Sequence, residues 1–360
     1  MSGSTRRAGR RGWKGWSTVS QRVPTVRDVA VRAGVSVGTV SKALNNRGQL
    51  REETRARVVA AARDLGFRPN ALAQSLQSGR TYTVAVITTD RFGRFGNPLM
   101  LGVEDALGAD RVSVFLCDTR DDPIREHHHA QTLDERRVDG IIVAGRRKQT
   151  RPPLAVASGV PVVYVIAQSS DPSDFCVTTD DVGGGALAGR HLLAAGRTHI
   201  GHITGPERFA DPRERAAGLQ SVLDSAGLDL AGGQVFYGEW SEDWGRRAAE
   251  MLLHAAPDTD AIFCGSDQIA RGVVETLRDR RLRVPGDIAV VGFDNWEPMA
   301  AGCRPPLTTV DPNLREVGRV AATRLLDMIA GTPVQGSTET VPAWLMLRES
   351  TGVRLVDPQS

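Results

Sequence analysis

The stretch TVRDVAVRAGVSVGTVSKALNN, residues 25–46, predicts two short helices joined by a tight turn. Thr25 can cap the first helix while Asp28, three residues later, returns a hydrogen bond, which is the capping-box pattern. Gly34 can end this helix, because glycine adopts a positive φ without steric cost. Ser36 can cap a second helix by accepting a backbone hydrogen bond. Two short helices around a glycine turn predict a helix-turn-helix unit.

A third helix is expected over residues 52–65, where Val58 and Ala62 recur on one face. Arg51 precedes it and cannot accept a hydrogen bond, so this helix should begin without a side-chain cap. The second helix, residues 37–44, is the expected reading helix. Its polar face offers Thr39, Ser41, Lys42 and Asn45.

The charge of the chain is divided unevenly along its length. Residues 1–80 carry 16 lysines and arginines against 4 aspartates and glutamates, whereas residues 81–360 carry 29 against 38. The helical unit could be only a structural module, but this excess of positive charge favours DNA binding. Residues 1–22 lack apolar periodicity and are expected to form a disordered basic tail. That tail either adds attraction to phosphate or is a solvated leader without a role.

The composition argues against several other classes of protein. No run of 18 apolar residues could form a transmembrane helix, and the charged N-terminus lacks the apolar core of a secretory signal. The four cysteines, Cys117, Cys176, Cys264 and Cys303, lie far apart, which argues against a zinc site or a disulfide framework. We therefore expect a cytoplasmic protein.

Beyond residue 80, short apolar runs rich in valine and isoleucine alternate with helical stretches. This alternation predicts βαβ units with parallel sheets buried on both faces, and about 280 residues suit two such half-domains better than one. A cleft at the carboxyl ends of the strands is the expected ligand site. The expected strands are Tyr82–Thr88, Val112–Cys117, Gly140–Ala144, Val160–Ile166, His199–Gly205, Ala261–Cys264 and Ile288–Phe293.

Two motifs suggest chemistry that their surroundings do not support. The glycines at 183–185 follow a strand, yet they match neither the dinucleotide nor the P-loop pattern, and Asp180 or Asp181 beside them suits a helix N-cap. The histidines at 127–129 are consecutive, so on a helix they point about 100° apart and cannot all face one metal ion. No catalytic constellation is visible. We expect no enzyme activity, no cofactor and no metal.

These segments together resemble the LacI/GalR family of bacterial transcription regulators. The head pattern is carried by residues 25–46 and by TRARVVAAARDLGFRPNALAQSLQSGRT, residues 54–81. The resemblance covers nearly everything from residue 25 to 353. It implies a helix-turn-helix head, a hinge helix and a body like the periplasmic sugar-binding proteins, with two doubly wound lobes of parallel sheet. The matching body segments, in the family's order, are RRVDGIIV (136–143), GVPVV (159–163), TTDDVGGGALAGRHLLAAGRTHIGHITGP (178–206), RERAAG (213–218), DAIFCGSDQIARGVV (260–274), VPGDIAVVGFDN (284–295), PPLTTV (305–310) and LRESTG (347–352).

The resemblance implies a dimer that binds a pseudo-palindromic operator through the second helix. Ser36 and Thr39 would contact phosphate or cap the helix. Val37, Gly38 and Lys42 would occupy the base-reading positions. Val37 offers only apolar contact and Gly38 has no side chain, so direct readout would fall on Lys42 and operator shape would carry more of the specificity. Further DNA contacts are expected from Thr25, Ser41, Asn45 and Asn70.

Residues 69–76, with the sequence PNALAQSL, resemble the hinge helix of this family. Leu76 matches the leucine that wedges into the minor groove at the operator centre, where insertion unstacks a base step and kinks the duplex. Alternatively, Leu76 is a linker residue that packs on its dimer mate. The segment is short and polar enough to fold only on DNA, and it would then couple the head to the body.

The resemblance also implies an effector site between the lobes. Arg215 and Asp294 fall on the family's effector-binding arginine and its acidic partner, and such a pair suits the hydroxyls of a sugar or polyol. Alternatively, they form a structural ion pair across the cleft. Trp240 falls on an aromatic that some members stack on a pyranose, unless it only packs in the core. Ser266 and Phe95 are further candidates.

Two neighbouring positions modify this expectation. Asp267, beside Ser266, is expected to be a helix N-cap. Ile166 stands where some sugar-binding members have an acidic ligand residue, so a plain copy of their hydrogen-bond set is not expected.

The expected function is a dimeric, nucleoid-associated repressor of carbohydrate-utilisation genes, controlled by a small polar effector such as a sugar. No C-terminal leucine heptad is present, which favours a dimer over a tetramer. A solute-binding protein of the same fold without a role on DNA is the alternative. The expected domains are a tail over 1–22, a helix-turn-helix domain over 23–69, a hinge and linker over 70–80 and a body over 81–360, with a first lobe of 81–166 plus 296–325 and a second of 167–295 plus 326–353.

Overall fold

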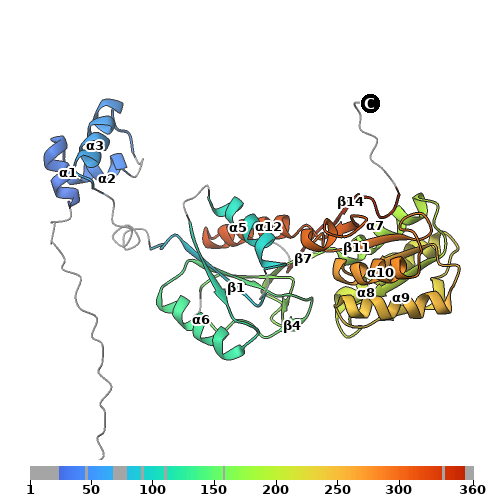
Figure 1. Ribbon diagram of the computed structural model, residues 1–360. Helices are drawn as coiled ribbons and strands as arrows, with labels where there is room; N and C mark the ends of the chain where they lie inside the picture. The colour runs from blue at the N-terminus through green and yellow to red at the C-terminus, as the bar shows by residue number, and fades with distance from the viewer. Residues whose placement is uncertain are drawn as a thin grey trace, which may run out of the picture. The chain divides into compact units, whose positions relative to one another are not determined.

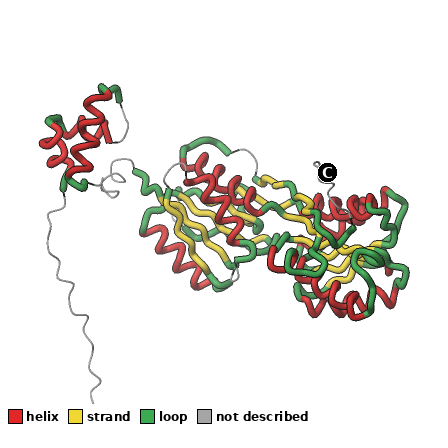
Figure 2. Tube along the Cα trace, turned by 45° about the horizontal axis from the view of Figure 1, so that its top comes forward, coloured by secondary structure: helices red, strands yellow, loops and turns green. Residues whose placement is uncertain are grey.

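The computed structural model describes the chain in segments that leave out both ends. The described residues are 24–44, 48–67, 79–90, 93–108, 112–156, 159–334 and 337–352. The chain divides into two compact units, residues 1–79 and 80–360. Figure 1 labels the elements, and Figure 2 shows which parts of the chain are helix, strand and loop.

Three helices form the first unit around a small apolar core. They are α1 (Val26–Ala33), α2 (Val37–Leu44) and α3 (Glu52–Asp64). Each helix contributes one fully buried valine to this core, namely Val29, Val40 and Val58. The apolar positions predicted from the sequence therefore face inward, and the polar positions between them remain for solvent or a ligand.

The ends of these helices follow the predicted local signals. The capping box is present, since Asp28 Oδ2 accepts a 2.8 Å hydrogen bond from the backbone of Thr25 while the Thr25 side chain accepts from the backbone of Asp28. Gly34 ends α1 with a φ of 64°. The Ser36 hydroxyl accepts from the backbone of Thr39 at 3.2 Å, at the start of α2. The third helix begins at Glu52, and its N-cap residue Arg51 provides no side-chain cap, as predicted.

Two six-stranded sheets carry the second unit. Their orders are β13-β7-β5-β3-β1-β2 and β14-β12-β11-β10-β8-β9. Neighbouring strands are parallel except β14, which lies antiparallel to β12. The first sheet comprises β1 (Thr83–Thr88), β2 (Ser113–Asp118), β3 (Gly140–Ala144), β5 (Val162–Val165), β7 (Phe175–Thr179) and β13 (Thr338–Val341). The second comprises β8 (Ile200–Thr204), β9 (Val235–Tyr237), β10 (Ala261–Cys264), β11 (Ala289–Phe293), β12 (Thr308–Asp311) and β14 (Trp344–Met346), while β4 (Thr150–Arg151) and β6 (Gln168–Ser169) pair separately.

Alternate residues of β1 face opposite layers of helices. Val84 and Val86 belong to the core under α5 (Gly96–Leu107) and α12 (Leu314–Ile329). Ala85 and Ile87 belong to the core under α6 (Pro123–Glu135). A strand covered on both faces has no solvent side, which is why it appears in the sequence as a continuous apolar run. All seven strands expected from such runs are present, each within two residues of its expected ends.

The second sheet is covered by paired helices that approach each other closely. Its helices are α7 (Asp181–Ala194), α8 (Ala210–Ser225), α9 (Glu242–Ala255) and α10 (Asp267–Asp279), with the short α11 (Glu297–Ala300) and a 3-10 turn, η2 (Ala231–Gly233). A Cβ on Gly185 of α7 would lie 2.1 Å from the carbonyl oxygen of Arg215 in α8. A Cβ on Gly218 would lie 2.0 Å from the carbonyl oxygen of Val182. Gly185 and Gly218 therefore allow α7 and α8 to pack closely, and this packing positions the backbone of Arg215.

The expected division of the two lobes is wrong at three strands. β7, expected in the second lobe (167–295), pairs with β5 in the first sheet. β12, expected in the first lobe (296–325), pairs with β11 in the second sheet. β13, expected in the second lobe (326–353), pairs with β7 in the first sheet. Each of these strands is hydrogen-bonded into the sheet of the lobe opposite to the expected one. The chain therefore crosses between the lobes where β7, β12 and β13 end, after residues 179, 311 and 341.

Two expected segments fall largely on residues that the structure does not describe. The tail over 1–22 lies wholly outside the described residues, and the hinge over 70–80 is described only at Gly79 and Arg80. In the parts of the chain that are described, no helix is long and apolar enough to cross a membrane.

Candidate functional site

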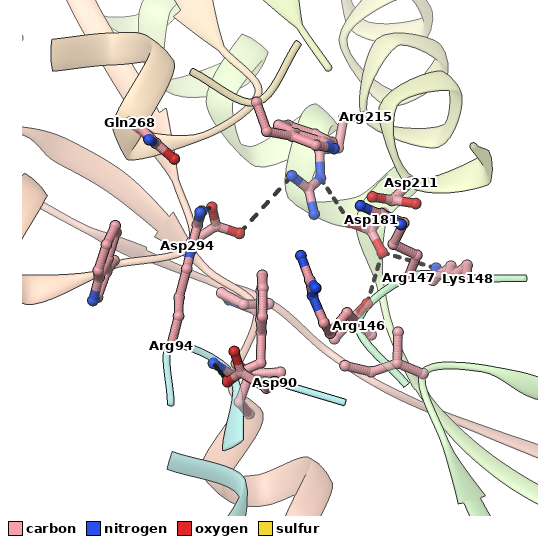
Figure 3. A pocket seen from close by; sticks show the side chains of 17 residues that line it. Asp90, Arg94, Arg146, Arg147, Lys148, Asp181, Asp211, Arg215, Gln268 and Asp294 are labelled. Carbon is pink, nitrogen blue, oxygen red and sulfur yellow. Dashed lines mark hydrogen bonds and ion pairs between the residues drawn. The ribbon is translucent and has the colours of Figure 1, made fainter. Parts of the chain in front are cut away.

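A cavity of about 410 Å³ lies between the two sheets of the second unit (Figure 3). The loops after β1, β3 and β5 and the end of β7 form one side of it. Helix α8 and the loops after β9, β11 and β12 form the other side. The cavity therefore lies at the carboxyl ends of parallel strands, where such sheets bind ligands. Four of the five expected effector residues line it, namely Phe95, Arg215, Trp240 and Asp294.

Arg215 is held by three groups around its guanidinium. Its Nε donates to Asp181 Oδ1 at 2.7 Å, and its Nη1 donates to the carbonyl oxygen of Gly265 at 2.5 Å. The guanidinium carbon lies 3.6 Å from the centre of the Phe293 ring. Arginine carries five N–H donors, so this fixed fork keeps donors for a ligand in the cavity. Because its position is set before binding, little ordering cost remains when a ligand arrives.

Lys148 connects the first lobe to the second. Its Nζ lies 2.9 Å from Asp181 Oδ2 and 2.5 Å from Glu214 Oε2, which belong to α7 and α8. Burial acts to raise the pKa of Asp181, but the charges of Arg215 and Lys148 outweigh it and hold that pKa below its usual range. Asp181 therefore stays ionised and shared between two cations, one from each lobe.

Asp294 makes another ionic contact between the lobes. Arg94, from the loop after β1, forms an ion pair with Asp294, which follows β11. Burial lowers the pKa of Arg94 to about 10. Arg215 Nη1 lies 3.9 Å from Asp294 Oδ1, so these two expected site residues are neighbours. Both belong to the second lobe, and the pair that crosses the cleft is Arg94–Asp294.

The backbone at Asp294 is also unusual. Its φ is 98°, and that of Asn295 is 48°, a region that residues with side chains rarely adopt. Such strain persists where the surrounding structure enforces it, often at binding sites. The strained turn directs the Asp294 carboxylate into the cavity.

The expected roles of Ser266 and Asp267 are wrong. Ser266 is the N-cap of α10, where its fully buried hydroxyl accepts from the backbone of Ile269 at 3.2 Å, and it does not line the cavity. Asp267 is buried instead of capping the helix, and it accepts from the backbone of Trp296 at 2.7 Å and the hydroxyl of Thr309 at 2.5 Å. The sequence does not show which of two adjacent polar residues is the N-cap. If the helix starts one residue earlier than expected, Ser266 becomes the cap and the side chain of Asp267 points into the core.

The buried carboxyl of Asp267 should make stability depend on pH. Burial raises its pKa to about 7 from an ordinary 3.8, so the folded chain keeps a proton that the unfolded chain releases. Its contribution therefore falls as pH rises from about 4 to about 7 and is constant above that. Burial lowers the pKa of His202 to about 4, which acts in the opposite sense between about pH 4 and 6.5.

The two contributions can be separated by comparing the wild type with Asp267→Asn. Urea unfolding of both proteins between about pH 4.5 and 8 gives the difference in free energy of unfolding at each pH. We expect this difference to shift in favour of the variant as pH rises towards 7, because the amide does not ionise. A difference that stays constant with pH would contradict a raised pKa at Asp267.

Trp240 and Phe95 line the cavity as predicted. Trp240 is half-buried, lines the cavity and also packs on the apolar core of the second lobe, so core packing is not its only contact and stacking on a sugar stays a prediction. Phe95 lies directly before α5, with the guanidinium of Arg94 5.0 Å from its ring centre. Ile166 also lines the cavity, where it adds apolar surface and no hydrogen-bonding side chain.

Several charged residues of the cavity were missed in the sequence. Arg146, Arg147 and Lys148 directly follow β3, and Asp181 and Asp211 come from the starts of α7 and α8. The available signal was the RRK run at the carboxyl end of a predicted buried strand. Of the two predicted cap candidates, Asp180 is the N-cap of α7. Among the described residues, no group of three or more histidine, cysteine, aspartate or glutamate side chains could hold a metal ion.

The first unit carries the expected reading helix. At the start of α2, Ser36, Val37 and Gly38 are exposed, and so is Lys42 one turn later. Thr39 and Ser41 are half-buried, and the Thr39 hydroxyl lies 2.9 Å from that of Ser36. Thr25, which caps α1, is exposed as well. The expected DNA contacts Asn45, Asn70 and Leu76 lie outside the described residues.

Comparison with known proteins places this chain in a family. A family model for bacterial regulatory proteins of the lacI family matches residues 25–70, and one for the periplasmic binding protein-like domain matches residues 190–351. The chain is 33% identical over 328 residues to the ribose operon repressor of Escherichia coli (strain K12), which covers 91% of this chain and 99% of the relative. It is 33% identical over 337 residues to the HTH-type transcriptional regulator CelR of Thermobifida fusca, with 92% and 99% covered.

Solved structures agree with these relatives. The complex of the transcriptional regulator CelR with cellobiose has a TM-score of 0.64 at 32% identity, covering 91% of this chain and 99% of the other. The lac repressor dimer bound to operator and the anti-inducer ONPF has a TM-score of 0.71 at 26% identity, covering 92% and 99%. These relatives are transcriptional regulators, and the expected fold class is confirmed. The chain belongs to the LacI family of bacterial transcriptional regulators.

Proposed function

We propose that this chain is a dimeric repressor whose affinity for a pseudo-palindromic operator changes when a small polar effector enters the cavity. The observation that carries this is the presence, in one chain, of a helix-turn-helix unit with an exposed reading face and a two-lobed body with a prearranged polar cavity. The relatives named as repressors, and the lac repressor seen with its operator, support the same function.

On the DNA side, α2 enters the major groove. Lys42 donates to a base edge, and Val37 and Gly38 allow the helix to approach closely without adding polar readout. Specificity then rests partly on the shape of the operator. DNA contacts by Asn45 and Asn70 and insertion of Leu76 into the minor groove remain predictions.

On the effector side, the cavity suits a molecule with several hydroxyl groups. Arg215 presents donors, and the carboxylates of Asp294 and Asp211 can each accept hydroxyl protons. Trp240 offers an apolar face on which a sugar ring can stack. The relatives that are named for ribose or seen with cellobiose support a carbohydrate effector and carbohydrate-utilisation genes.

The mechanism follows from linkage between two states of the body. The ion pairs Arg94–Asp294 and Lys148–Glu214 join the lobes, so a ligand that competes with them or adds to them favours one degree of closure. If that closure is incompatible with the DNA-bound arrangement of the hinge, effector binding and operator binding oppose each other by the same coupling free energy. This chain then acts in the cytoplasm by binding, without catalysis.

The test is a selection of DNA by the full chain from a random library, followed by effector titration on the recovered site. We expect a pseudo-palindromic site and a loss of affinity when the correct effector is added. Residues 80–360 alone should bind the effector and not the DNA. Recovery of no preferred sequence would overturn the repressor function and favour a solute-binding protein of this fold.

A further inference from the structure

The cavity contains more positive charge than its own carboxylates neutralise. Five cationic side chains line it, namely Arg94, Arg146, Arg147, Lys148 and Arg215. Four acidic side chains line it, namely Asp90, Asp181, Asp211 and Asp294. The ion pairs and hydrogen bonds among these side chains decide which of the charges remain available to a ligand.

Most of the charges are already engaged. Arg94 pairs with Asp294, and Asp181 is shared by Arg215 and Lys148. The carboxylate of Asp90 accepts 2.7 Å hydrogen bonds from the backbone N–H groups of residues 95 and 96. These charges therefore have an opposite charge or backbone donors beside them, although Asp294 Oδ2 is buried without a hydrogen bond and can still accept one from a ligand.

Arg146 and Arg147 are different. Within the described parts of the chain, neither has a carboxylate within 4.0 Å, and neither donates a hydrogen bond to a side chain or a carbonyl group. The guanidinium carbon of Arg147 lies 4.5 Å from the centre of the Phe209 ring, so an aromatic face supports the group while its N–H edge stays free. Figure 3 shows both arginines near Lys148 and Asp181.

The electrostatics of this pair are unfavourable without a ligand. Burial, followed by the positive charge of Arg146, lowers the pKa of Arg147. Asp211 and Asp121 attract Arg147 from a distance but do not cancel these effects. Two adjacent guanidinium groups at a cavity wall therefore lack a negative partner, and the fork of an arginine suits the paired oxygens of a carboxylate or a phosphate.

One carboxylate oxygen near these arginines lacks a hydrogen-bond partner. Asp211 is 8% exposed, and its Oδ1 is buried without a hydrogen bond. A buried acceptor without a donor is costly, so a ligand hydroxyl that donates to it is favoured. One ligand can satisfy both needs if it carries an oxyanion at one end and hydroxyl groups at the other.

We infer that the effector is a polyhydroxylated molecule with one oxyanion group, which binds Arg146 and Arg147 while its hydroxyls donate to Asp211 and Asp294. This inference rests on the proposed function, because it names the chemical class of the effector. A sugar phosphate and a sugar acid share the required chemistry. A neutral sugar would leave the two arginines as they are.

The first experiment needs no knowledge of the natural effector. The melting temperature of the full chain is measured in inorganic phosphate and, for comparison, in chloride at the same ionic strength. We expect phosphate to stabilise the wild type more than it stabilises Arg146→Gln/Arg147→Gln, because a ligand that binds the native state raises its stability. The control variant Arg246→Gln/Arg247→Gln removes two charges from α9, outside the cavity, and should respond like the wild type. Anion binding by the basic head is the same in all three proteins and cancels.

The second experiment identifies the source of the anion by calorimetry with glucose, gluconate and glucose 6-phosphate. We expect one of the two anions to bind at least about tenfold more tightly than glucose, and the double variant to lose that advantage. Equal phosphate responses of the wild type and the cavity variant, or glucose as the tightest ligand in both, would overturn the inference. A cavity that binds anions in a chain that selects no operator would instead overturn only the proposed function.

Discussion

We expect Arg215→Ala to abolish effector binding and to lower the free energy of unfolding of the body by about 3–5 kcal/mol, because it removes one partner of a buried ion pair. Asp181, 1% exposed, would keep only Lys148 as its cationic partner. The carbonyl oxygen of Gly265 would lose its donor, and Phe293 would lose the group packed on its ring. The cavity would also lose its best-positioned hydroxyl-binding fork.

Two further variants separate stability from binding. Arg213→Ala, on the same helix but exposed, should change both quantities little. Asp181→Ala added to Arg215→Ala should recover part of the stability, because a buried carboxylate that has lost one of its two cationic partners is removed, but it should recover none of the effector binding. Urea unfolding and calorimetry measure the two effects. Full recovery of effector binding in the double variant would show that Arg215 acts only as a structural partner of Asp181.

Local signals made the first unit predictable. The capping box at Thr25, the turn at Gly34 and the start of α2 at Ser36 depend on residues within four positions of one another. Six of the seven strands found from sequence are buried on both faces and therefore form continuous apolar runs, whereas β2 is a partly exposed edge strand whose residues are also largely apolar. The strands that were missed are short or polar, such as β9 with three residues and β13 with the sequence TETV.

Long-range pairing explains the errors in the lobe boundaries. Whether β7 or β12 joins one sheet or the other depends on partners far away in the chain, and both strands look the same locally. The expected lobe bounds imply three crossings between the lobes, but at the wrong positions in the chain. Those crossings place Asp181 and Lys148, which come from different lobes, against each other.

The candidate site was found only in part for a related reason. Arg215 and Asp294 were identified through the resemblance, whereas the role of the run Arg146–Lys148 depends on which carboxylates lie nearby in the folded chain. A sequence shows which residues are charged, but it does not show which of them form ion pairs in the folded chain. Once Asp181 and Asp294 are assigned to other cations, Arg146 and Arg147 are left without a carboxylate partner among the described residues.

The second large effect is expected in the head, where Gly38→Glu should abolish operator binding without unfolding the unit. A Cβ at Gly38 meets only the Ser36 hydroxyl, at 3.8 Å, so the new side chain has space. Replacing a glycine inside a helix gains about 0.5–1 kcal/mol, and a carboxylate near the start of α2 is favourable for the helix dipole. The melting temperature of the head should therefore stay the same or rise.

Operator affinity should respond in the opposite direction. At the reading face the carboxylate would be desolvated against phosphates without a cation, and an uncompensated buried charge costs roughly 3–5 kcal/mol, or at least about 100-fold in affinity. Val31→Glu makes the same charge change on α1, at a side chain that is 84% exposed, and should weaken binding only a few-fold through general repulsion. Fluorescence anisotropy with the selected operator measures both variants. Equal losses would mean that only net charge matters and that α2 does not enter the groove, whereas a loss confined to Gly38→Glu assigns the reading of the operator to this helix.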